Sequence, residues 1–159
     1  MYTGVEENNM KIFNGLEELA GAAGTDLGST GWVSIDQARI DLFAEATGDH
    51  QWIHVDPSRA ENGPFGGTIA HGLLTLSLLP VLLGELYRVD GVSMAVNYGL
   101  GKVRFPSPVP AGAKLRATSQ VASVAPLDGA VQVTFSTVME VDDSPKPACV
   151  VESIVRYVA

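Results

Sequence analysis

The sequence predicts an α+β fold in which a curved antiparallel sheet wraps around one buried helix. The most hydrophobic segment, residues 68–87, is apolar on nearly every face, as is typical of a helix enclosed by the rest of its domain. Residues 92–158 then change to an alternation of apolar and polar residues, the period of half-buried strands. A sheet with one apolar face buries that face and the helix together when it curves around the helix.

Length and composition agree with one folded domain, which we place over residues 11–159 after a polar, loosely held extension over residues 1–10. The chain has 159 residues, 46% of them hydrophobic, which is too apolar for intrinsic disorder. Its net charge of −8 disfavours nucleic-acid and anionic-membrane partners. A single cysteine, Cys149, excludes a disulfide framework, and neither a signal pattern nor a membrane span is evident. We therefore expect a cytoplasmic protein.

The first predicted helix covers residues 37–47, where Ile40, Phe43 and Ala44 recur at helical spacing. Ser34 or Asp36 is placed to cap its start and Gly48 to end it. Residues 49–67 hold two prolines, three glycines and few periodic apolar positions, which predicts an ordered loop with one short helical turn.

The buried helix over residues 68–87 contains Pro80, which is expected to kink it or shorten its second half. Four long strands are predicted after it, over residues 92–105, 113–124, 131–141 and 148–158. Asp128-Gly129 supplies a hairpin turn before the third strand. An open sheet of this kind leaves free edges, so we expect a homodimer whose sheets join edge to edge.

The polar residues suited to chemistry gather in residues 47–57 and 66–72, which include all three histidines. Their pattern is Gly48-Asp49-x-Gln51-x-Ile53-His54-x-Asp56, followed by Ala70-His71-Gly72. This pattern resembles the hydratase-2 signature of the MaoC-like (R)-specific enoyl-CoA hydratases, and is most similar to single-domain actinobacterial members. The resemblance continues through Asn97-Tyr98-Gly99 and residues 102–106.

The resemblance implies the hot-dog fold and the reversible hydration of a trans-2-enoyl-CoA to an (R)-3-hydroxyacyl-CoA. Asp49 and His54 would hold and activate the water, since hydration needs a base for the water proton and an acid for C2. No metal or other cofactor is implied, because coenzyme A is part of the substrate. Side chains five residues apart point about 140° apart on a regular helix, so Asp49 and His54 converge only if the helix ends at Gly48.

Further site residues are expected around this pair. The Gly72 backbone N–H, near the start of the buried helix, would donate to the thioester oxygen as it gains enolate charge. Gln51 would position the substrate, and it stands where the family usually has Asn, which bears on substrate range. Weaker candidates for binding the coenzyme A phosphates are the cations nearest the motifs, Arg59, Lys102 and Arg104.

His50 and His54 have the spacing of helical metal ligands and His71 offers a third nitrogen, but the segment has the composition of a loop, so we predict no metal. We expect His71 to be structural, bonding loop carbonyls. Three alternative functions remain open: an acyl-CoA thioesterase that places water at C1, a non-catalytic acyl-binding subunit, and a 3-hydroxyacyl dehydratase acting on acyl-carrier-protein substrates.

Overall fold

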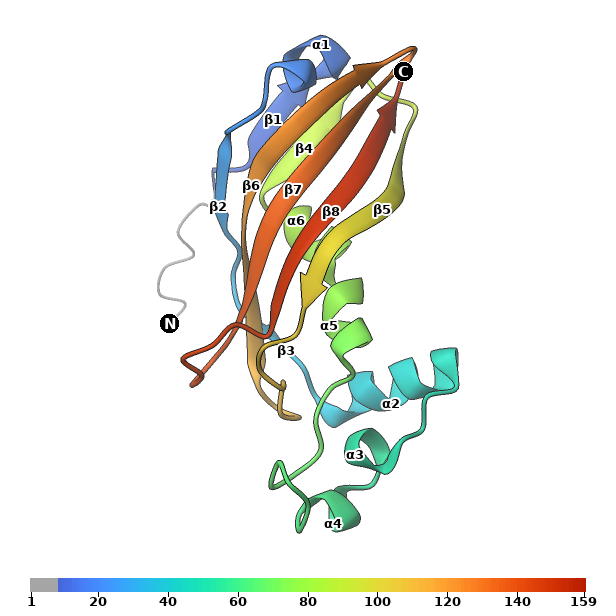
Figure 1. Ribbon diagram of the computed structural model, residues 1–159, viewed down its shortest axis with the longest axis vertical. Helices are drawn as coiled ribbons and strands as arrows, with labels where there is room; N and C mark the ends of the chain where they lie inside the picture. Colours follow the sequence, from blue (N-terminus) through green and yellow to red (C-terminus); the bar gives the residue numbers. More distant parts are fainter. Residues whose placement is uncertain (1–8) are drawn as a thin grey trace, which may run out of the picture.

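The computed structural model describes residues 9–159, so most of the predicted extension over residues 1–10 lies outside the described residues (Figure 1). The helices are α1 (Gly15–Ala20), α2 (Gln37–Thr47), α3 (Trp52–Val55), α4 (Pro57–Ala60), α5 (Gly72–Ser77) and α6 (Leu79–Leu83). The strands are β1 (Lys11–Asn14), β2 (Asp26–Ser29), β3 (Val33–Ser34), β4 (Tyr87–Asp90), β5 (Met94–Arg104), β6 (Lys114–Leu127), β7 (Ala130–Val141) and β8 (Cys149–Val158). Over these residues, none of the helices has the length and apolar character needed to span a bilayer.

The main sheet is antiparallel, in the order β2-β6-β7-β8-β5, with β3 also paired to β6. A separate parallel pair joins β1 and β4. Figure 1 shows the long strands curving past α5 and α6, while α2, α3 and α4 gather beyond the start of α5. The predicted α+β architecture with a curved antiparallel sheet around a central helical segment is confirmed.

The third long strand, β7, shows why the alternation in the sequence was informative. Every second residue, from Val131 to Val141, is buried against the helices, which is the pattern of a half-buried strand. Leu127 pairs with Ala130 across Asp128-Gly129, and Gly129 has a φ of 69°. The two-residue hairpin turn was therefore predicted correctly.

The central helix differs from the prediction of one helix over residues 68–87. It is divided at Leu78 into α5 and α6. Pro80 lies in the first turn of α6, where its missing N–H costs no hydrogen bond, so it begins a new helix. Residues 68–71 and 84–86 are outside both helices, and Tyr87 begins β4. The two helices are also not buried on every face, because the apolar side chains of Leu73 and Val81 are 63% and 65% exposed.

Candidate active site

The end of α2 places the first candidate catalytic residue. Asp36 caps the helix, its carboxylate accepting a hydrogen bond from the Arg39 N–H at 2.9 Å. Gly48 ends it with a φ of 80°, a left-handed conformation that favours glycine. The chain leaves the helix at Gly48, as predicted, and Asp49 follows at an exposed position. The loop after it holds two short helices, α3 and α4, where one helical turn had been expected.

The structure brings Asp49 and His54 together, and it adds His71 to them. One ligand atom from each of the three side chains lies within 4.8 Å of the other two. His54 comes from α3 and His71 from the residue before α5. Because Asp49 is exposed while both imidazoles are buried, the cluster has one side open to solvent and one closed by protein.

His54 is held in a defined tautomer. Its Nδ1 lies 2.7 Å from the Ile69 carbonyl oxygen, and since a carbonyl only accepts, Nδ1 carries the hydrogen. The neutral ring then has its lone pair on Nε2, which is free to accept a proton. The side chain is 6% exposed. Sequence reasoning missed Ile69, because a backbone acceptor has no residue-type signal.

His71 contacts both members of the pair. Its Nε2 donates to the Asp49 carbonyl oxygen at 3.0 Å, the bond to a loop carbonyl that was expected of a structural histidine. The ring stacks on that of His54 and packs at a tilt against Phe43, with 4.8 Å between the His71 and Phe43 centroids. His71 Nδ1 is buried and has no hydrogen-bond partner within residues 9–159.

Gly72 is the first residue of α5, where the backbone N–H has no acceptor inside the helix. A Cβ at this position would lie 3.2 Å from ring atoms of Phe105, so any larger residue would press the ring and the helix start apart. Gly72 also lines a largely apolar pocket of about 330 Å³ that includes Ile69 and Phe105. The predicted oxyanion donor therefore lies in the wall of a cavity that is also lined by Ile69, the residue whose carbonyl binds His54.

The remaining candidates lie farther out. Gln51 is exposed at the start of α3, and its carbonyl accepts from the His54 N–H at 3.0 Å. The Arg59 guanidinium stacks over the Trp52 ring at 4.3 Å. Lys102 and Arg104 are exposed on β5. None of the three cations is among the residues lining the pocket at Gly72.

The three histidines considered as metal ligands in the sequence do not come together as a set. His50 is not part of the cluster: its Nε2 lies 3.6 Å from a Glu45 carboxylate oxygen, and its side chain is half exposed. Asp49 takes its place in the cluster. Each of the two buried imidazoles already donates one N–H to a backbone carbonyl, which leaves the lone pair of the other nitrogen on each neutral ring free to accept.

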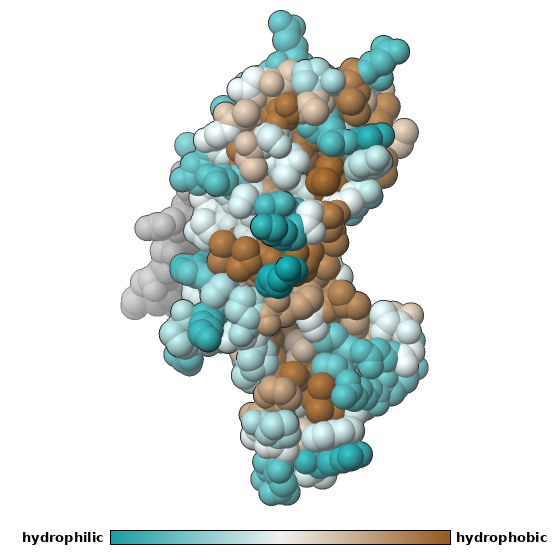
Figure 2. Space-filling model, in the orientation of Figure 1, coloured by the Kyte–Doolittle hydropathy of each residue, from teal (hydrophilic) through white to brown (hydrophobic). Residues whose placement is uncertain are grey.

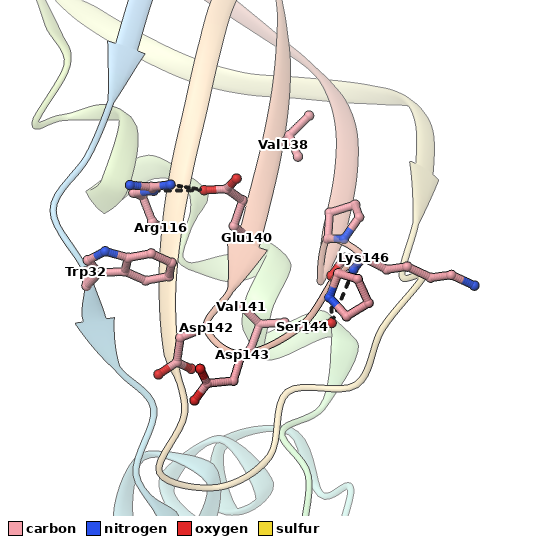
Figure 3. Close-up of a pocket in the computed structure, with 11 residues that line it drawn as sticks. Trp32, Arg116, Val138, Glu140, Val141, Asp142, Asp143, Ser144 and Lys146 are labelled. Atoms are coloured by element: carbon pink, nitrogen blue, oxygen red, sulfur yellow. Dashed lines mark hydrogen bonds and ion pairs between the residues drawn. The ribbon is translucent and has the colours of Figure 1, made fainter.

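A larger pocket, of about 440 Å³, lies on another part of the molecule, where Trp32 approaches the turn between β7 and β8 (Figure 3). Two of its charged side chains pair with each other: Arg116 forms an ion pair with Glu140 and also stacks over Trp32 at 4.6 Å. None of the site residues predicted from the sequence lines it.

Comparison with known proteins gives the family. A family model described as a MaoC like domain matches residues 18–142. The 3-hydroxyacyl-thioester dehydratase Z of Mycobacterium tuberculosis (strain ATCC 25618 / H37Rv) is 60% identical over 151 residues, covering 94% of this chain and 100% of that protein.

Two solved structures share the fold. The (R)-hydratase from A. caviae involved in PHA biosynthesis is 24% identical, with a TM-score of 0.63, covering 84% of this chain and 98% of its own. The C-terminally truncated HadBC (3R-hydroxyacyl-ACP dehydratase) complex from Mycobacterium tuberculosis is 20% identical, with a TM-score of 0.67, covering 83% and 98%. These likenesses confirm the predicted hot-dog fold. Given the family match and the 60% identical relative, the chain belongs to the MaoC-like domain family and is a hydro-lyase.

Proposed function

We propose that the protein is an (R)-specific enoyl-CoA hydratase, which adds water reversibly to trans-2-enoyl-CoA to form (R)-3-hydroxyacyl-CoA. One observation carries the proposal: the His54 tautomer that leaves Nε2 as a proton acceptor, with the Asp49 carboxylate in the same cluster. A water held between them can attack C3 while losing a proton. The same pair then supplies the proton to C2, so the two proton transfers balance without a cofactor.

The second requirement of the reaction is a donor for the thioester oxygen as it becomes enolate-like. The Gly72 N–H has no acceptor within its helix and lines the adjacent pocket, which supports its role as that donor. Gln51, at the open side of the cluster, is proposed to position the substrate. Arg59, Lys102 and Arg104 are exposed cations available to coenzyme A phosphates.

The choice of carrier is part of the proposal. The 60% identical relative is named only as acting on a 3-hydroxyacyl thioester, and one structural neighbour is named as an acyl-carrier-protein dehydratase. Both carriers present the same thioester to the same reacting groups, so the chemistry at Asp49 and His54 is common to them.

The first test is a spectrophotometric assay of the purified protein with crotonyl-CoA and with a longer trans-2-enoyl-CoA. Loss of the enoyl-thioester absorbance, an (R)-3-hydroxyacyl product on chiral analysis and no free thiol would support the proposal. Release of free thiol would identify a thioesterase. Turnover of the acyl-carrier-protein thioester alone would identify acyl-carrier protein as the carrier. Absence of activity with both the coenzyme A and the acyl-carrier-protein thioesters would favour a binding role.

We also propose that a second copy of the chain pairs with the β5 edge. β5 ends the main sheet, so one of its edges has no neighbouring strand within residues 9–159. Figure 2 shows hydrophobic side chains along this side of the molecule. Exposed apolar residues on β5 and on the adjacent helices include Val96, Leu100, Leu73 and Val81. A dimer by light scattering that dissociates in Val96→Lys is expected, and a wild-type monomer would contradict the proposal.

A further inference from the structure

A groove runs between the central helices and the sheet. It consists of two cavities of about 340 Å³ each, which share the four lining residues Leu79, Pro80, Asn97 and Ser153. The first cavity begins at Leu76, four residues after Gly72 and so about 6 Å farther along the helix axis. The second extends toward β4 and the end of β8. We call this continuous space the seam groove.

One wall atom of the seam groove is unusual. Ser153, on β8, is 5% exposed, and its Oγ has no hydrogen-bond partner among the described residues. Buried hydroxyls elsewhere in the sheet are paired, as in Ser119 and Thr137, whose hydroxyl oxygens are 2.8 Å apart. An unpaired buried hydroxyl costs stability, so the Ser153 side chain is suited to a partner that enters the groove.

The sheet is irregular at the same place. The pairing of β5 with β8 shifts register between Asn97 and Gly99 and again between Leu100 and Val103. Leu100 pairs with Ser153 in the short stretch between these two irregularities. β-Bulges bend a strand and are frequent beside binding sites. Ser153 therefore lies where β5 departs from regular pairing and where both cavities meet.

The groove offers a neutral lining to whatever occupies it. Leu76, Leu79 and Leu83 line its helical side. At its far end the hydroxyl oxygens of Tyr87 and Tyr157 are 2.5 Å apart, and burial raises the pKa of both groups, which keeps them protonated. Arg88, at the rim, is bound to Asp90 at 2.7 Å. Such a lining suits an uncharged aliphatic chain.

We infer that the seam groove receives the acyl chain and that Ser153 selects chains carrying a neutral oxygen substituent, a hydroxyl or a keto group, remote from the thioester. This inference rests on the proposed function. Leu79 and Pro80 begin α6, which follows the six residues of α5, and these six residues span about 9 Å along their axis. The recognised oxygen is thus separate from the hydroxyl that the reaction adds at C3. Ser153 donates to it or accepts from it.

The experiment compares trans-2-decenoyl-CoA with three derivatives of it, each hydroxylated at one of the last three carbons. The wild type is expected to have a kcat/KM about tenfold higher for one of the hydroxylated substrates than for the unsubstituted chain, which is the scale of one hydrogen bond. In Ser153→Ala the order should invert, because the hydroxyl would then be buried without a partner. Ser77→Ala is the matched control, since Ser77 lines the same groove but its hydroxyl already donates to the Leu74 carbonyl at 2.7 Å. That variant should keep the wild-type preference.

A wild type without preference for any hydroxylated derivative, or a preference that survives Ser153→Ala, would overturn the inference and indicate that water occupies the site. Calorimetric binding of the saturated decanoyl-CoA and its hydroxylated derivatives to the same three proteins separates this result from failure of the proposed function. Absence of turnover with every enoyl-CoA would refute the hydratase. The Kd ratios between hydroxylated and plain chains would still support or overturn the role of Ser153.

Discussion

The imidazole rings of His54 and His71 lie stacked, with centroids 3.8 Å apart and planes inclined by 23°. Each ring is also fixed by a hydrogen bond to a backbone carbonyl, His54 to Ile69 and His71 to Asp49. The two bonds tie the loop after α2 to the residues that precede α5. The positions of Asp49 and His54 therefore depend on the same stacked pair of rings and its two hydrogen bonds.

The proposed catalytic pair makes a direct prediction. Asp49→Asn and His54→Gln should each lower turnover of crotonyl-CoA by roughly 10²–10⁴-fold, the usual effect of losing a positioned acid or base. Circular dichroism should show an unchanged fold. His50→Gln is the matched control, because His50 lies outside the cluster, and it should stay within about twofold of the wild type. Near-normal rates in either site variant would remove the assignment.

Close contact at Gly72 makes a second prediction. The methyl group of Gly72→Ala would meet the Phe105 ring at 3.2 Å, so either the ring or the start of α5 must move. We expect turnover to fall by about tenfold or more, since small displacements of a catalytic donor are costly. Adding Phe105→Ala should restore part of the rate by making room. An unchanged rate in Gly72→Ala would contradict this prediction, and would show that the Phe105 ring yields to the methyl group without displacing the N–H of residue 72.

The thiol of Cys149 should be unreactive in the folded protein. The residue is fully buried, and burial raises the pKa of its thiol to about 11. Since the thiolate is the reactive form, a disulfide reagent such as DTNB should not label the native protein at pH 8 over minutes. One thiol per chain should appear after denaturation in guanidinium. Rapid labelling of the native state would contradict the burial of β8 at this position.

The Tyr87–Tyr157 pair predicts a loss of stability in alkali. Burial raises the pKa of both tyrosines above the ordinary value of 10.0, so the folded state holds these protons more tightly than the unfolded state. Their contribution is fully present below pH 10 and is lost as the pH rises above it. Urea unfolding from pH 8 to pH 11 should show this decline in the free energy of unfolding. The decline should be smaller in Tyr87→Phe/Tyr157→Phe, and equal slopes would refute the assignment.

Local patterns predicted the regular elements well. The helix over residues 37–47 has the predicted bounds, because Asp36 and Gly48 are capping residues whose effect is local. The four long strands lie within a few residues of their predictions, since an alternating face has the same period wherever it packs. The short elements β1, α1, β2, β3 and β4 were not predicted. Strands of two to four residues are too short to display a period, and their pairing partners supply their conformation.

The sequence by itself determined which residues are available for chemistry and where the backbone must turn. Its motif named Asp49, His54 and Gly72, and Gly48 predicted that the helix would end before them. Only the tertiary structure decided how those residues meet. The Ile69 carbonyl that sets the His54 tautomer is 15 residues away, and His71 and Asp49 are 22 residues apart. Such contacts arise from the folding of one segment against another, so no local pattern of residue types encodes them; the unpaired Ser153 hydroxyl is visible for the same reason only in the folded chain.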